Sequence, residues 1–139
     1  MTITQAMPTS FKSELLNKEH DLNTDTFKIA LYTSSASMDA TTTAYSVTNE
    51  ISGTGYSAGG KTLSGGAIST SGTTAFVDFT DPSWTTASFT ANGALIYNST
   101  ASNKAVAVLA FGGDFTVTTG TFTIVFPAAA AGTALIRIA

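Results

Sequence analysis

The chain has 139 residues but only 15 charged side chains, six basic and nine acidic, for a net charge of −3. It contains one histidine and no cysteine, whereas 41 residues are threonine or serine. This inventory excludes thiolate chemistry and clusters of histidine metal ligands. Nucleic acid is not an expected partner, because no basic stripe is present to displace counterions from phosphates. We expect no catalytic residue, cofactor or metal site.

Nothing in the sequence predicts membrane insertion or secretion. The first residues lack the basic start and apolar run of a secretory leader. The most apolar stretches, 105–111 and 128–138, are too short or too interrupted to span a bilayer. We therefore expect a single domain made in a cytosol, with no membrane partner.

Residues 1–25 are predicted to form an N-terminal arm that contains one short helix. Met7, Phe11 and Leu15 follow one another at intervals of four residues, which places them on one face of a helix over about 8–18. A helix of about three turns is marginal alone, so its apolar stripe must dock on another surface.

Two docking partners for this stripe remain open at this point. The stripe either covers the open end of the body of the same chain or reaches a neighbouring subunit. In the second case the segment around Ile3 could also add as a strand to the edge of a partner sheet. The candidate subunit-interface residues are Ile3, Met7, Phe11 and Leu15.

Residues 26–139 are predicted to form an all-β body, an antiparallel β-sandwich or jelly-roll-like barrel of about 8–10 short strands. The first strand alternates apolar and other residues and is expected to be half-buried, and a polar loop over 33–43 follows it. Asn92-Gly93 predicts a type I′ hairpin turn, and Gly120 a second hairpin. The expected strands are 27–32, 45–51, 56–63, 73–79, 85–90, 94–98, 104–111, 115–119, 121–126 and 134–138.

Three polar features have residue types that could form a chemical or modification site. His20 follows the predicted helix, where the macrodipole favours a histidine without any catalytic role. Asp78 and Asp81 could contribute to a calcium site or act as paired carboxylates, but a solvent-facing Asp78 and a turn begun by Asp81 before Pro82 are favoured. Asn98 begins a glycosylation sequon, which has no use without secretion.

Two further patterns are weaker. Gly53, Gly55 and Gly59 superficially resemble a dinucleotide-binding loop, but their spacing is wrong and no helix is predicted to follow. A sugar-stacking platform would need exposed aromatic rings on one face, whereas aromatic residues of a sandwich more often pack in its core. The candidate platform residues are Tyr32, Tyr45, Tyr56, Trp84 and Tyr97.

Several ordered blocks of the sequence resemble small virion proteins of tailed bacteriophages, and more closely their capsid cement, or head decoration, proteins. The similarity extends over nearly the whole chain. The blocks are ITQAM at 3–7, SFKxELL at 10–16, FKIALY at 27–32, TxY at 43–45, NEISGTGYxAGG at 49–60, GALIYNS at 93–99, AVAVLxFG at 105–112 and IRIA at 136–139, where x marks a position outside the resemblance.

This resemblance implies a jelly-roll-like, non-enzymatic protein on the outer surface of a virion, assembled in the cytoplasm of the bacterial host. It also implies that the protein bridges neighbouring major capsid protein subunits and pairs as a homodimer. Two alternatives remain: a tail-associated or receptor-binding phage module, and a glycan-binding or glycan-cleaving domain that uses the aspartates and aromatic residues named above.

Overall fold

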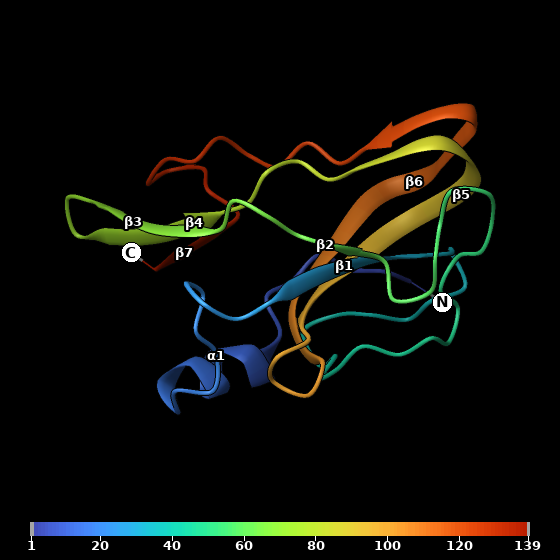
Figure 1. Ribbon diagram of the computed structural model, residues 1–139. Coiled ribbons are helices and arrows are strands. Elements are labelled where there is room, and N and C mark those ends of the chain that lie inside the picture. Colours follow the sequence, from blue (N-terminus) through green and yellow to red (C-terminus); the bar gives the residue numbers. More distant parts are fainter. Residues whose placement is uncertain (1, 139) are drawn as a thin grey trace.

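The computed structural model describes residues 2–138 as an all-β, sandwich-like fold of two antiparallel sheets with one short helix (Figure 1). This confirms the predicted fold class. The larger sheet has the strand order β2-β1-β5-β6 and the smaller has β3-β4-β7. The elements are α1 (Thr9–Leu16), β1 (Phe27–Tyr32), β2 (Lys61–Thr62), β3 (Ala67–Ser71), β4 (Thr74–Asp78), β5 (Ser83–Asn98), β6 (Lys104–Thr123) and β7 (Ile136–Ile138).

The dominant feature of the fold is the long β5–β6 hairpin. The two strands pair from Asn98 opposite Lys104, next to the connecting turn, to Ser83 opposite Thr123 at the far end. The sequence predicted five shorter strands in this region. As a result, the described residues contain seven strands rather than eight to ten.

The turns predicted at Asn92-Gly93 and Gly120 are wrong, because both positions lie inside these continuous strands. At Gly93 the reason for glycine is close packing rather than a turn. A Cβ atom added there would lie 2.6 Å from the carbonyl oxygen of Leu109 and 2.7 Å from Cδ1 of Ile3. Glycine in a strand can therefore mark a close approach as well as a bend.

Other strand predictions were correct in part. Strands β1, β4 and β7 occur within their predicted ranges, give or take a residue. The ranges 45–51 and 56–63 are mostly irregular, and apart from the two residues of β2 they contribute isolated bridges such as Tyr32 opposite Glu50. Strand β3 was not predicted, because its residues are all exposed and carry little hydrophobic alternation.

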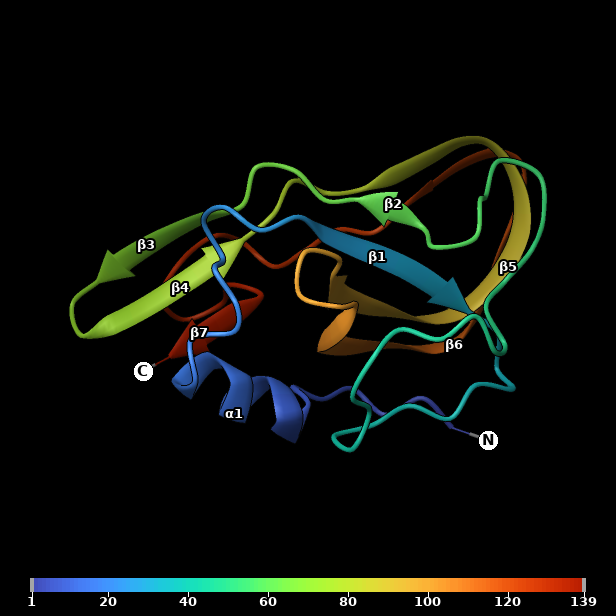
Figure 2. The ribbon, with the colours of Figure 1, turned by 60° about the horizontal axis from the view of Figure 1, so that its bottom comes forward.

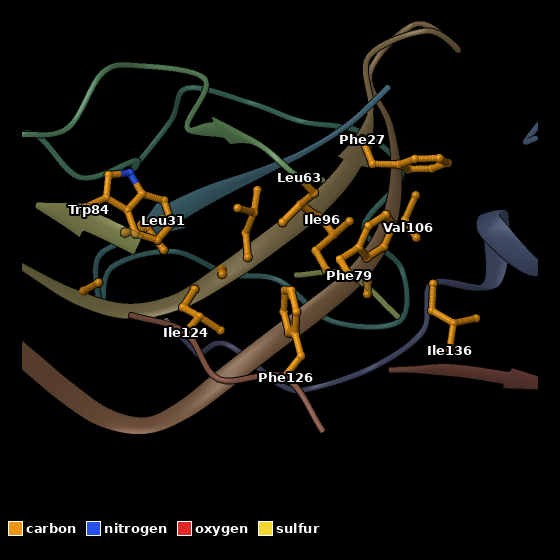
Figure 3. Close-up of a cluster of buried hydrophobic side chains, with 14 of the residues drawn as sticks. Phe27, Leu31, Leu63, Phe79, Trp84, Ile96, Val106, Ile124, Phe126 and Ile136 are labelled. Atoms are coloured by element: carbon orange, nitrogen blue, oxygen red, sulfur yellow. The ribbon is translucent and has the colours of Figure 1, made fainter. Parts of the chain in front are cut away.

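The half-buried pattern expected for β1 is also wrong, because this strand is buried on both faces. On one face its side chains join a large core with residues of the smaller sheet and the segments beside it (Figure 3). In that core Leu31 and Ile96 of the larger sheet lie on the same side as Phe79, Phe126 and Ile136. The smaller sheet contributes Val77 and Ile136 to this core, and the segments beside it contribute Phe79, Ile124 and Phe126.

The opposite face of the larger sheet has a second, smaller core that a loop and the N-terminus cover. Ala30, Tyr32 and Leu95 of the sheet pack there against Ile3 and Met38. The N-terminal segment bonds to the loop, since the Met38 carbonyl oxygen accepts from the Thr4 amide at 2.8 Å. The polar 33–43 segment therefore works as a cover for the sheet rather than as a free loop.

The β5–β6 hairpin bends strongly along its length (Figure 2). The pairing register shifts at four places, and Thr86 and Thr119 have positive φ angles of 49° and 45° within the two strands. Bulges of this kind increase local twist and re-aim the strand. In the far half of β6, from Gly112 to Thr123, Val117 and Phe122 still pack against the larger core, but most of the residues are exposed.

Candidate functional site

The two aspartates weighed as a chemical pair act on separate backbone groups. Asp78 Oδ1 accepts from the amide of Phe79 at 2.9 Å, whereas Asp81 Oδ1 accepts from the distant amide of Phe126 at 2.8 Å. Asp78 Oδ2 is buried without a hydrogen-bond partner. A solvent-facing Asp78 was therefore the wrong expectation, and Asp81 holds two segments together. Residues 2–138 contain no group of three or more His, Cys, Asp or Glu side chains arranged for a metal ion.

Of the five aromatic residues proposed as a sugar platform, three are buried and two are partly buried. Tyr32, Trp84 and Tyr97 are 2%, 4% and 3% exposed. Tyr45 stacks on Tyr97 with ring centroids 4.6 Å apart, and Tyr56 lies edge-on to Phe89. A stacking platform must present ring faces to solvent, so the packing interpretation is the one that the geometry supports.

Four of these aromatic residues, the tyrosines, surround Glu50, which sequence reasoning did not single out as a site. The Glu50 carboxylate accepts hydrogen bonds from the Tyr45 hydroxyl at 2.6 Å, from the Tyr56 hydroxyl, and from the Gly59 amide at 2.8 Å. The Tyr97 hydroxyl donates to the Gly59 carbonyl oxygen at 2.5 Å. Because each of these polar groups has a partner, the network fixes the irregular 44–60 segment against the sheet. The sequence does contain a signal for this site: Glu50 is the only charged residue between Asp39 and Lys61, and Tyr45 and Tyr56 lie on either side of it.

All four tyrosines of the chain are expected to resist ionisation in the folded protein. Burial, with the nearby Glu50 charge, raises the pKa of each phenol above its ordinary value of about 10. A raised folded-state pKa contributes stability that is present below the unfolded pKa and lost as pH rises above it. Phenolate absorbance should therefore stay low above about pH 10 and rise only with loss of circular dichroism. Gradual ionisation of a still folded protein would contradict this.

His20 is a buried structural link just beyond α1. Its Nε2 lies 2.8 Å from Glu14 Oε1, and its Nδ1 lies 3.0 Å from Asn98 Nδ2. Asn98 Oδ1 accepts from the backbone amides of Thr100 and Ala101, which assigns its NH₂ group to His20. His20 Nδ1 is therefore the acceptor and Nε2 carries the hydrogen. This network ties the arm to the end of β5.

The glycine-rich segment and the sequon are likewise structural. Gly55 has a φ of 83°, and a Cβ atom there would lie 3.0 Å from Ala87 Cα, so the segment lies directly on β5. A neighbouring bridge joins Thr54 to Ser88. Asn98, the sequon asparagine, is completely buried, which leaves no access for a glycan in the folded chain.

The four candidate interface residues pack within their own chain. Phe11 is fully buried in the larger core, and Met7 and Leu15 are partly buried against it. Ile3 belongs to the second core. Leu16, 93% exposed, is the apolar residue of α1 that faces solvent. Exchange of the arm with a second subunit stays a prediction.

A group of neighbouring apolar side chains, two of them exposed, lies at the far half of β6 and just beyond it. We define the distal β6 patch as Phe111, Phe115, Phe122 and Val125. Phe115 is 53% and Val125 76% exposed, while the other two rings are partly buried. These residues, with Thr123 and Ile124, line a hollow of about 260 Å³. Sequence reasoning missed this patch because it placed Phe115 and Phe122 in an ordinary sandwich hairpin.

Comparisons with known families, curated proteins and solved structures find no match to this chain. In the described part of the chain, no helix has the length and apolarity needed to cross a membrane. The functional proposal therefore rests on the residues and surfaces described above. They combine an interior in which Glu50, His20 and Asn98 are held by hydrogen bonds with an exposed apolar patch suited to protein contact.

Proposed function

We propose that this chain is a virion structural protein that decorates the outer surface of a phage capsid. In this proposal it stabilises the shell by bridging neighbouring major capsid protein subunits, pairs with itself as a homodimer, and is assembled in the host cytoplasm. It acts by adhesion and catalyses no reaction. The role is suggested by the ordered sequence blocks that resemble those of cement proteins.

The observation that carries the proposal is the contrast between the interior and the distal β6 patch. Inside, Glu14, His20 and Glu50 are engaged in structural hydrogen bonds. Outside, Phe115 and Val125 keep more than half of their surface in solvent. Exposed apolar patches on a soluble protein mark sites of contact with other proteins.

The rest of the surface is also suited to adhesion. The 41 threonine and serine residues supply short hydroxyl side chains, and only six lysine or arginine residues are present. Short side chains lose less conformational entropy than long charged ones when an interface orders them. Many copies on one closed shell would further convert weak single contacts into strong overall retention.

The proposal is tested on purified heads prepared with and without this protein. We expect heads that lack it to open at a lower temperature and at a less extreme salt concentration, because fewer contacts join neighbouring capsid subunits. Adding the purified protein back should restore resistance, whereas an unrelated β-protein of similar size should not. Equal resistance of the two preparations would contradict the stabilising role, and labelling at the tail would favour the tail-associated alternative.

A further inference from the structure

We propose that the distal β6 patch is a two-fold interface, and that its occupant is the same patch of a second copy of this chain. This inference deepens the proposed function, on whose pairing it rests, by assigning a surface to that pairing. The proposed interface does not include the arm residues Ile3, Met7, Phe11 and Leu15, which already pack within their own chain.

The patch is an outward extension of the larger core. Phe122 lies 5.2 Å from the buried Phe89 and 6.1 Å from Phe111, measured between ring centroids. Phe111 in turn lies 6.2 Å from the exposed Phe115. An apolar contact made at Phe115 would therefore rest on rings fixed by the core, which reduces the cost of ordering them on binding.

Charge identifies a second copy as the fitting partner. Of the 15 charged residues, only Asp114 falls within 105–136, and its carboxylate accepts a hydrogen bond from Asn92 Nδ2 at 2.9 Å. Two copies that each carry a net charge of −3 repel each other across most other surfaces. Contact through the patch brings few like charges together, because the charged residues beside it are Asp114, Asp81 at the Phe126 amide, and the basic Arg137 of the adjoining groove.

The shape of the patch also suits a two-fold axis. In a two-fold interface one patch meets itself, so it must carry both a projection and a recess. Val125 projects, with 76% of its surface exposed, and the hollow of about 260 Å³ lies within the same patch. A larger groove of about 600 Å³ shares Phe111, Ile124 and Val125 with that hollow and continues it toward the arm. Rotation about the axis brings each projection toward the recess of the other copy.

Contact through side chains is favoured over a continuous strand ladder. Two short segments of the same chain already pair with the inner part of β6, through Ala44 opposite Lys104 and Ala6 opposite Val108. Farther out, the strand has positive φ angles at Gly112 and Thr119 and shifts its register beside both. Bulges of this kind interrupt an edge and prevent long pairing with another chain. The apolar faces of the patch remain available.

The area required is compatible with the size of the protein. A stable interface buries about 800 Å² on each partner. The described chain exposes 6979 Å², so such a contact would occupy about a tenth of its surface. The patch would supply the apolar centre, and the exposed threonines of outer β6 the polar rim.

The test compares two matched substitutions by sedimentation velocity over a range of protein concentrations. We expect the unaltered protein to have twice the chain mass of 14.2 kDa. Val125→Asp should weaken the dimer about 100-fold or more, because it places a charge at the apolar centre. Val47→Asp, at a site 64% exposed in the loop after β1, adds the same charge and should leave the dimer unchanged.

Phe115→Thr provides a second variant, which adds no charge and keeps a strand-forming residue in β6. Circular dichroism checks that each variant is folded. A monomeric unaltered protein would overturn the interface, as would a dimer that Val125→Asp and Phe115→Thr leave intact. If such a protein still restored the resistance of purified heads, the proposed function would stand without this interface. A dimer that depends on Val125 but gives heads no added resistance would retain the interface and contradict the function.

Discussion

Replacing Gly60 by alanine is expected to lower the free energy of unfolding by about 4 kcal/mol or more, one of the largest effects of any single substitution in this chain. Gly60 has a φ of 81°, a conformation that side chains rarely adopt. A Cβ atom there would also lie 2.6 Å from the carbonyl carbon of Ile29 and 2.8 Å from Ala30 Cα. Both obstacles are backbone atoms of the central strand β1, so no side chain can move to relieve the clash.

Gly72 offers a matched control for this effect, measured by denaturant unfolding. It also has a positive φ, 59°, but an added Cβ atom would meet nothing within 4 Å. Gly72→Ala should therefore cost only the strain of the left-handed backbone, about 1 kcal/mol. Equal losses at the two sites would show that backbone conformation, rather than contact with β1, decides the cost.

The contrast between these glycines also explains which parts of the fold could be predicted from the sequence. Local patterns located α1, β1 and β4, although the alternation in β1 did not indicate that both of its faces are buried. A glycine, however, carries no local sign of whether it serves a turn or a close contact. Gly93 was predicted to form a turn, but the approach of Ile3, 90 residues earlier in the chain, requires glycine there.

Long-range pairing likewise decided the β5–β6 hairpin. Asn92 and Gly120 have the residue types of turns, yet each strand has a partner along its whole length, and that pairing outweighs local preference. The true turn lies between Asn98 and Lys104, where Ser102 and Asn103 have positive φ angles of 55° and 58°. The predicted strand ends at 98 and 104 were correct here, because the apolar runs on each side stop at those positions.

The candidate site shows the same contrast between local patterns, which could be predicted, and long-range contacts, which could not. That the chain is poor in reactive side chains could be read from composition, whereas the partners of individual polar residues could not. Glu50 and His20 acquire their roles from groups brought together by folding, such as Tyr56 of the loop and Asn98 of β5. The distal β6 patch depends on a bend in the hairpin, which sequence periodicity does not specify.

Asn98→Ala is expected to cost about 3 kcal/mol and to loosen the arm selectively, because this side chain connects three parts of the molecule. Its Nδ2 donates to His20 at 3.0 Å and to Asp25 Oδ2 at 2.8 Å, while its Oδ1 accepts from two amides of the β5–β6 turn. The substitution would leave several buried groups without partners, a cost that exceeds the net value of the lost bonds.

Hydrogen exchange separates this effect from general destabilisation. The amides of α1 should exchange faster in Asn98→Ala under conditions where those of β1 remain protected, since the arm loses its buried attachment while the sheet keeps its pairing. Asn92→Ala is the matched control: Asn92 lies in the same strand, but its side chain makes one exposed hydrogen bond, to Asp114. This substitution should leave the amides of both α1 and β1 protected from exchange. Equal acceleration of α1 and β1 in Asn98→Ala would mean that arm and sheet unfold as one unit. In that case His20 and Asn98 would stabilise the whole domain rather than fasten the arm to it.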